Sequence, residues 1–349
     1  MHVLDQLRVP IVQAPMAGGP STPTLAAAVT EAGGLGFIAA GYRSPQAMAG
    51  DIAETRSATG RPFGVNLFAP GEGPADAGVV SRYVERLASE AASAGVELGA
   101  PIFNDDDYES KLKRLLDEPV AVVSFTFGCP ETSAVHGLQS VGSSVWVTVT
   151  SAQEAEQAAA VGADALVVQG VEAGGHRGSF VDHDGRVDYG LLALLQLVRD
   201  AVDLPLVGTG GIATGAAIAA VLAAGAAAAQ LGSAFMLCPE AGTSTAHRHA
   251  LSSDRPTGLT RAFSGRLARG IVNRWQEAYS DAAPIAYPEI HYVTAPLRAR
   301  ARQAGDLDVI NLWAGEAHAL AREAPAAEVV AMLERDARDA AERLRRLLL

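Results

Sequence analysis

One histidine of this chain lies where a protein would present a reactive side chain to a ligand. The short apolar run Ala165 to Val168 is followed by Gln169 to Gly178, which reads Gln-Gly-Val-Glu-Ala-Gly-Gly-His-Arg-Gly. An apolar run of this length is typical of a strand buried on both faces of a parallel sheet. Glycines let the backbone approach a ligand closely. His176 is therefore the candidate catalytic residue, and we expect its ligand to be flat with a polar edge.

Two other glycine clusters, at 208–212 and 230–234, each follow a short apolar run. Backbone N–H groups in such turns, helped by the positive end of a helix dipole, bind a phosphate dianion without a lysine. The donors expected to do this belong to Gly210, Gly211, Gly232 and Ser233.

Uncharged polar groups follow other apolar runs. The turn Ala14-Pro15-Met16 comes after the first run, Asn66 lies near the end of the third, and Gln169 ends the sixth. Amide donors and acceptors without charge suit the edge of a heteroaromatic ring.

Eight short apolar runs, most of them followed by a helical segment, set the fold. This alternation predicts a parallel (β/α)8 barrel, whose sites lie at the carboxyl ends of the strands. An open doubly wound sheet is the alternative, but no dinucleotide fingerprint follows the first run. The runs are 11–14, 35–40, 63–68, 120–125, 145–149, 165–169, 205–209 and 227–231. A helix is expected at 79–94 behind the third run, and 101–119 is interpreted as a polar excursion.

Three parts of the chain are expected. Residues 1–238 form the barrel, residues 239–325 an inserted lid or substrate subdomain, and residues 326–349 an amphipathic helix packed on the barrel or a partner subunit. In the second part, Tyr287 and His291 are further candidates for substrate contact, with an ordinary packing role as the alternative.

Composition excludes several classes of function. A net charge of −12 argues against nucleic acid and anionic membrane as partners. No apolar stretch is long enough to span a bilayer and no signal segment begins the chain, so a soluble cytoplasmic protein is expected. Cys129 and Cys238 lack disulfide or zinc spacing, and no catalytic metal is expected. The only lysines, Lys111 and Lys113, are expected on a solvated helix face.

These segments together resemble the nitronate monooxygenase family, formerly called 2-nitropropane dioxygenases, and most of all its class I members. The resemblance covers essentially the whole chain. Matching segments in chain order are 10–18, 63–67, 124–130, 168–178, 208–212 and 230–235.

The resemblance implies a barrel that holds non-covalent FMN. Ala14, Pro15, Met16, Asn66 and Gln169 would lie near the flavin ring, and His176 would face its reactive side. The positions that would hold the ribityl phosphate or adjoin it are Gly174, Gly175, Gly210, Gly211, Gly232 and Ser233.

Two positions depart from the family pattern. Ser233 stands where threonine is frequent, which keeps the hydroxyl group. Glu316 follows the family-like segment 311–315 where glutamine is common, so a carboxylate replaces an amide.

The activity that the resemblance implies is oxidative denitrification of alkyl nitronates, such as propionate 3-nitronate. Oxygen would be consumed, and a carbonyl compound and nitrite or a related nitrogen oxide would form. His176 would hydrogen bond the nitronate or act as a general base on a neutral nitroalkane. The alternatives are an NAD(P)H-dependent FMN reductase acting on quinones or enoyl thioesters, and a flavin-binding protein without turnover. A monomer and a homodimer are both compatible with the sequence.

Overall fold

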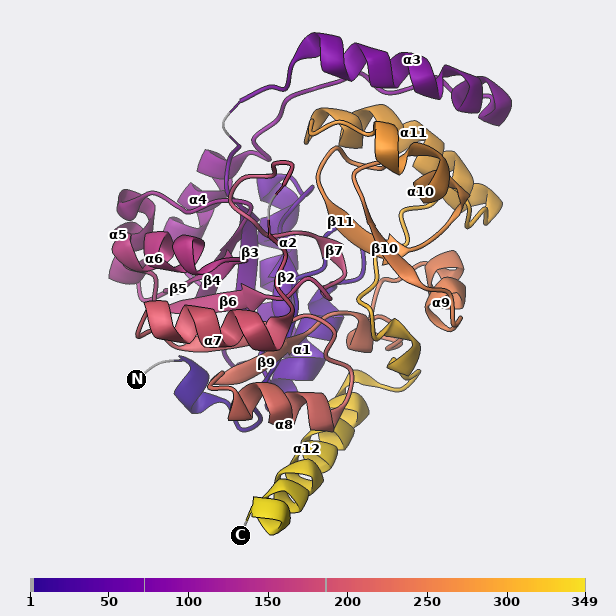
Figure 1. Ribbon diagram of the computed structural model, residues 1–349. Helices are drawn as coiled ribbons and strands as arrows, with labels where there is room; N and C mark the ends of the chain where they lie inside the picture. Colours follow the sequence, from indigo (N-terminus) through magenta and orange to yellow (C-terminus); the bar gives the residue numbers. More distant parts are fainter. Residues whose placement is uncertain (1–2, 72, 186, 349) are drawn as a thin grey trace.

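Eight parallel strands form the centre of the molecule. The computed structural model describes residues 3–71, 73–185 and 187–348. The strands pair in the order β1-β9-β8-β6-β5-β4-β3-β2, and a bridge between Val12 and Leu35 joins the two ends. The expected (β/α)8 barrel is therefore confirmed (Figure 1). The strands are β1 (Ile11–Gln13), β2 (Phe37–Ala39), β3 (Gly64–Phe68), β4 (Val122–Thr126), β5 (Ser144–Val149), β6 (Ala165–Gln169), β8 (Leu206–Thr209) and β9 (Ala228–Leu231).

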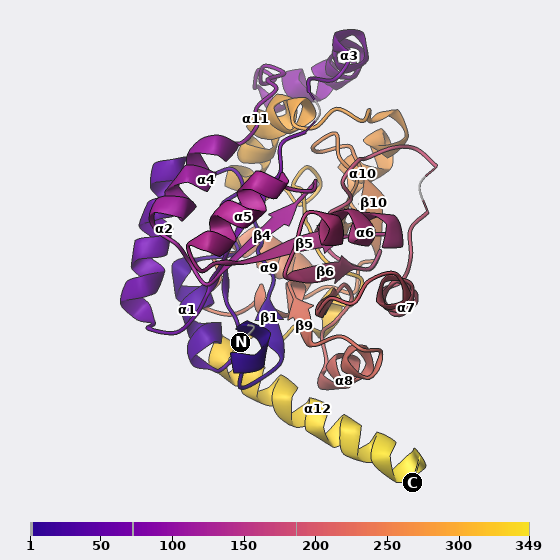
Figure 2. The same ribbon diagram turned by 90° about the vertical axis from the view of Figure 1, so that its left-hand side faces the viewer.

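Helices surround this barrel (Figure 2). Side-chain caps fix several of their starts, as where the Thr22 hydroxyl accepts from the N–H of Leu25 at 3.0 Å. The surrounding helices are α1 (Pro23–Glu31), α2 (Pro45–Ala58), α4 (Tyr108–Asp117), α5 (Thr132–Ser140), α6 (Ala152–Ala160), α7 (Leu191–Ala201) and α8 (Gly215–Ala223). None of the described helices is both long and apolar enough to cross a bilayer.

The helix expected behind the third strand lies elsewhere. α3 (Ala77–Ala94) packs against α11 (Glu289–Ala304), above the barrel in Figure 1. Its buried Val80 and Leu87 share a core cluster with Trp275 of the added subdomain. The assignment of 79–94 to the barrel wall was wrong, because an amphipathic pattern shows that a face is buried but not which surface covers it.

The helix that does cover the third strand is α4, inside the segment interpreted as a polar excursion. It contacts β3, α2 and α5. Leu112 and Leu115 are buried there, while charged residues occupy the outer face. Lys113 is solvated as expected, but Lys111 is only 1% exposed. The Lys111 ammonium donates to the Ala40 carbonyl at 3.0 Å and pairs with Asp106 at 2.6 Å, so its placement on a solvated face was wrong.

An added subdomain follows the barrel. Its antiparallel sheet has the order β10-β11-β7, formed by β10 (Thr257–Thr260), β11 (Ala268–Ile271) and β7 (Gly175–His176). β7 belongs to the turn after β6, so the candidate histidine joins the barrel to the added sheet. The remaining elements are α9 (Thr245–Leu251), α10 (Arg274–Tyr279), and 3-10 helices at Val3–Gln6, Ser233–Phe235, Ser280–Ala282 and His318–Leu320.

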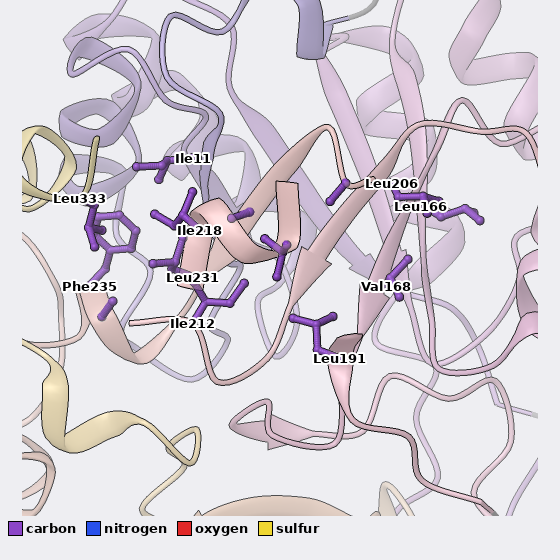
Figure 3. Close-up of a cluster of buried hydrophobic side chains, with 14 of the residues drawn as sticks. Ile11, Leu166, Val168, Leu191, Leu206, Ile212, Ile218, Leu231, Phe235 and Leu333 are labelled. Atoms are coloured by element: carbon purple, nitrogen blue, oxygen red, sulfur yellow. The ribbon is translucent and has the colours of Figure 1, made fainter. Parts of the chain in front are cut away.

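The last helix, α12 (Ala326–Leu348), packs its first half on α8 and α1. Leu333 lies in a barrel core cluster with Ile218 and Phe235 (Figure 3). The second half extends past the barrel, and Leu347 is 83% exposed (Figure 2). The division at 238 and 325 stays a prediction.

Candidate active site

A cavity of about 470 Å³ lies at the carboxyl ends of the barrel strands, where the added subdomain also contributes to its wall. His176, His291 and every residue expected near the cofactor line it. The cofactor candidates in this lining are Ala14, Pro15, Met16, Asn66, Gln169, Gly174, Gly175, Gly210, Gly211, Gly232 and Ser233. Tyr287 instead lines a neighbouring cavity of about 160 Å³, and Phe68 and Phe127 border both.

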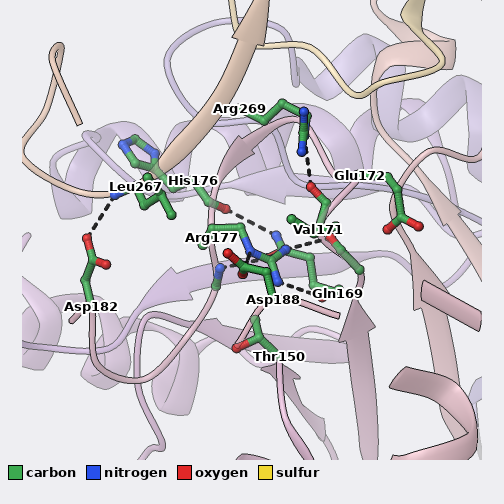
Figure 4. Close-up of polar contacts among 12 residues, drawn as sticks. Thr150, Gln169, Val171, Glu172, His176, Arg177, Asp182, Asp188, Leu267 and Arg269 are labelled. Atoms are coloured by element: carbon green, nitrogen blue, oxygen red, sulfur yellow. Dashed lines mark hydrogen bonds and ion pairs between the residues drawn. The ribbon is translucent and has the colours of Figure 1, made fainter. Parts of the chain in front are cut away.

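A buried arginine fixes the turn that carries His176. Arg177 donates to the Gln169 side-chain oxygen at 2.8 Å and to the Gly170 carbonyl at 2.6 Å (Figure 4). It also forms an ion pair with Asp188 at 3.3 Å. Because Arg177 ties the end of β6 to the turn, the backbone on both sides of His176 is held in one conformation.

Glycine is required at two positions of this turn, for two different reasons. A Cβ atom on Gly174 would lie 2.4 Å from backbone atoms of Ala314 and Gly315. Gly175 adopts a backbone φ of +75°, which residues other than glycine rarely adopt. A Cβ atom at this position would point into open space. The turn can therefore approach a ligand and the 314–315 segment at once.

His176 lines the cavity and contacts a hydroxyl group. Its Nε2 atom is 2.8 Å from the Ser264 oxygen, and no described residue forms a hydrogen bond with Nδ1. Burial lowers the pKa of His176 to about 3, with further lowering from the charges of Arg266 and Arg298. The imidazole is consequently neutral at physiological pH, inside a cationic cavity.

The glycine clusters after β8 and β9 present unused donors. The N–H groups of Gly210, Gly211, Gly232 and Ser233 donate no hydrogen bond to another described residue. Unpaired backbone donors are costly unless water or a ligand accepts from them. The four positions predicted from the sequence to hold a phosphate thus supply donors for one, and the Ser233 hydroxyl accepts from the N–H of Gly315 at 2.9 Å.

The amide side chains are partly committed to the protein. Asn66 donates to the hydroxyls of Ser124 and Thr126 at 2.9 and 3.0 Å, which leaves its oxygen as an acceptor. The oxygen of Gln169 accepts from Arg177 and from the N–H of Gly178. Its nitrogen donates to the His176 carbonyl at 3.2 Å, so Gln169 supports the histidine turn directly.

Aromatic rings form one wall. His291 stacks on Tyr42 with ring centroids 4.3 Å apart, and Tyr287 donates to the Tyr42 hydroxyl at 3.0 Å. Tyr287 also lies 5.6 Å from the His176 ring, centroid to centroid. Both lid candidates are therefore close to His176, although only His291 lines the larger cavity.

Several lining residues were not predicted from the sequence. His247 lines the cavity and bonds the Trp313 carbonyl at 3.0 Å, although no strand precedes it to indicate this. Trp313 lies 5.4 Å from the His176 ring, and the family-like segment 311–315 could have indicated it. The other missed residues with polar side chains include Tyr42, Ser264, Arg298, Arg302 and Asn311.

Glu316, whose role the sequence left open, forms an ion pair. Its carboxylate lies 2.9 Å from the Arg269 guanidinium, and Arg269 donates to the Val171 carbonyl at 2.9 Å (Figure 4). Glu316 does not line the larger cavity. The carboxylate thus braces the turn from outside.

Known proteins resemble this chain over nearly its full length. The sequence pattern of the nitronate monooxygenase family matches residues 3–336. A nitronate monooxygenase from Paraburkholderia phytofirmans is 42% identical, covering 96% of this chain and 94% of its own. One from Pseudomonas aeruginosa is also 42% identical, covering 95% and 97%.

Solved structures also resemble this chain over nearly its full length. The structure of a nitroalkane oxidase from Streptomyces ansochromogenes is 49% identical, with a TM-score of 0.96 over 98% of this chain and 99% of its own. That of FabK from Thermotoga maritima is 28% identical, with a TM-score of 0.77 over 98% and 96%. These relatives favour an oxidoreductase over a binding protein without turnover. The chain belongs to the nitronate monooxygenase family.

Proposed function

We propose that this protein is an FMN-dependent enzyme that uses oxygen to convert alkyl nitronates into a carbonyl compound and nitrite or a related nitrogen oxide. Propionate 3-nitronate is the representative substrate. The observation that carries the proposal is the neutral His176 in a cationic cavity that is also lined by backbone donors for which no described residue supplies an acceptor.

The residues of the cavity fit FMN. The four unpaired N–H groups after β8 and β9 supply donors for a phosphate where the sequence places no lysine. The open space beside Gly175 is the volume that a side chain would fill and a cofactor can occupy. The Asn66 oxygen remains as an acceptor for a ring N–H group. When bound, FMN would supply the electron transfer between substrate and oxygen.

His176 serves this reaction best as a hydrogen-bond donor. When the Ser264 hydroxyl donates to Nε2, the ring proton lies on Nδ1, the atom that no described residue contacts by a hydrogen bond. An anionic nitronate oxygen next to Nδ1 would favour this tautomer. The hydroxyl can also donate to the Arg266 carbonyl at 3.2 Å, which leaves Nδ1 as an acceptor.

Electrostatics favours an anion over a neutral nitroalkane. A general base works best when its pKa lies near the operating pH, whereas the pKa of His176 is lowered to about 3. The cationic charge of Arg266, which contributes more to this lowering than that of Arg298, also attracts an anion. We therefore propose that the enzyme takes up the preformed nitronate.

Product analysis tests the proposal. The FMN-loaded protein is supplied with propionate 3-nitronate or with freshly dissolved 3-nitropropionate, and nitrite and the carbonyl product are measured. We expect both products from the nitronate, and at least about 100-fold slower formation from the nitro form, the scale of a general-base contribution. Equal rates from the two forms would show that the protein deprotonates the nitroalkane.

A further inference from the structure

We propose that Arg298, Asn311 and Arg302 form a subsite for a carboxylate at the end of the substrate remote from its reacting carbon. We call these three residues the arginine subsite. The inference rests on the proposed function, since it names the class of nitronate that the cavity takes. That class carries a second negative charge.

Arg298 is a buried cation for which no described residue supplies a counter-charge. Its side chain is 4% exposed and lines the cavity. Within residues 3–71, 73–185 and 187–348, no carboxylate forms an ion pair with it. Burial lowers the pKa of Arg298 to about 10, the charge of Arg302 lowers it further, and Tyr42 acts in the opposite direction. Burying an unpaired charge is costly, so a protein keeps one where a ligand supplies the opposite charge.

A donor count shows which atoms remain for this ligand. A guanidinium has five N–H groups. The Arg298 Nε donates to Thr294 at 3.0 Å, and Nη2 faces the His291 carbonyl at 2.6 Å and the His291 Nδ1 at 3.4 Å. Nη1 makes one long contact with the Asn311 oxygen, at 3.5 Å. One N–H of Nη1 is therefore left over.

Asn311 adds a second free donor. Its oxygen accepts from Arg298 and, at 3.1 Å, from Arg302, whereas its amide nitrogen bonds no described residue. Arg302 is exposed and also lines the cavity. The unused groups of the arginine subsite are thus N–H donors on or beside two positive charges, which is the chemistry that binds an anion.

The position of the subsite identifies the anion as a substrate carboxylate. The Tyr287 ring contacts both His176 and His291, with centroid distances of 5.6 and 6.5 Å, and Arg298 contacts His291. Arg298 is also near enough to His176 for its charge to add to the lowering of the His176 pKa by burial. A nitronate at His176 would therefore reach Arg298 through a short carbon linker. We assign the FMN phosphate to the backbone N–H groups after β8 and β9, so the phosphate does not need the arginine subsite. A planar carboxylate also matches the guanidinium fork.

A pair of substrates tests the subsite by kinetics. Propyl 1-nitronate has a methyl group where propionate 3-nitronate has its carboxylate. In Arg298→Met we expect kcat/KM for propionate 3-nitronate to fall about 10- to 100-fold, as for a lost charged hydrogen bond, with most of the loss in KM. The value for propyl 1-nitronate should change less than about 3-fold, and Arg298→Lys should retain part of the preference.

The matched control is Arg300→Met. Arg300 lies on the same helix, is exposed and does not line the cavity. This variant should leave both substrates unaffected.

A binding measurement separates this proposal from the proposed reaction. Succinate and butyrate mimic the two nitronates but cannot react, and calorimetry of the FMN-loaded wild-type protein needs no turnover. We expect succinate to bind at least about 10-fold more tightly than butyrate, and Arg298→Met to abolish the difference.

The outcomes are distinct. Equal wild-type affinities would overturn the subsite even if Arg298→Met does not fold. Equal losses for both nitronates in a folded Arg298→Met would also overturn it. A succinate preference without nitronate turnover would support the subsite and contradict the proposed reaction instead.

Discussion

At the residue scale, the proposed function depends on the protonation state of one imidazole. Burial and the charges of Arg266 and Arg298 lower the pKa of His176 to about 3, so the side chain stays neutral from pH 5 upward. A histidine of ordinary pKa would instead titrate near 6.5. The two cases give different pH profiles.

We expect kcat/KM for preformed propionate 3-nitronate to show no inflection near pH 6.5 between pH 5 and 8. His176→Phe, which removes the ring nitrogens, should lower this value about 10- to 100-fold, the scale of a hydrogen bond to a charged group. His176→Asn keeps an N–H donor and should lose less. The measurement is initial rate against pH. An inflection near 6.5 that disappears in His176→Phe would instead assign a titrating histidine.

At the element scale, the turn after β6 shapes the cavity that we propose holds the cofactor. Gly175 has a φ of +75° with no atom near its missing Cβ, and Gly305, which ends α11, has a φ of +68° with equally open surroundings. Alanine at either position adopts an unfavourable backbone conformation, at about 1–2 kcal/mol. Only the Cβ at position 175 would enter the cavity.

We therefore expect Gly175→Ala to weaken FMN retention, and Gly305→Ala to leave it unchanged at a similar loss of stability. Flavin absorbance after gel filtration, together with the free energy of unfolding, measures both effects. Equal FMN retention in the two variants would exclude a close approach of the cofactor to this turn.

Lys111 fixes α4 to the barrel. Its ammonium pairs with Asp106, and the other Asp106 oxygen accepts from the N–H of Tyr42 at 2.9 Å. Tyr42 in turn stacks on His291. Removing one partner of a buried ion pair costs about 3–5 kcal/mol.

Lys111→Met should accordingly lower the free energy of unfolding by about 3 kcal/mol. Lys113→Met, on the exposed face of the same helix, should change it by less than about 0.5 kcal/mol. Urea unfolding of both variants measures the difference. A loss below 1 kcal/mol in Lys111→Met would show that the pair does not hold the helix.

The same elements show how far the sequence predicts the fold. The barrel strands were predicted because each is a short apolar run, a signal that the local sequence contains by itself. The roles of α3 and α4 could not be predicted, because both are amphipathic and only tertiary packing decides which one covers the barrel. β7 has two residues, and its pairing partner lies about ninety residues later, so no local signal marks it.

The candidate site also contains residues that the sequence predicts and residues that only the folded structure reveals. The glycine and histidine positions after β6, β8 and β9 follow from strand ends and from the resemblance. Arg298 and Asn311 reach the cavity from the added subdomain. The burial of Arg298 with no counter-charge among the described residues is a property of the folded chain only.

At the scale of the whole molecule, buried neutral histidines make stability depend on pH. Burial lowers the pKa of His247 to about 4 and that of His291 to about 2. The unfolded chain takes up protons below about pH 6.5 that the native state does not, so stability is complete above that pH and falls toward the native pKa values.

Between pH 6.5 and 5.0, His247 should account for up to about 2 kcal/mol of lost stability. His247→Gln should reduce the fall in unfolding free energy between pH 7.5 and 5.0 by that amount, whereas replacing the exposed His183 by Gln should not. Urea unfolding at the two pH values measures it. An unchanged pH dependence in His247→Gln would mean that this histidine is protonated in the native state.

The reaction itself is the property of the whole molecule, and oxygen consumption tests it most directly. FMN-loaded protein is given propionate 3-nitronate, NADH or NADPH, each as the single substrate. Rapid uptake with the nitronate and none with the nucleotides is the result we predict. No uptake with the nitronate, together with anaerobic flavin reduction by a nucleotide, would contradict the assignment and identify a reductase.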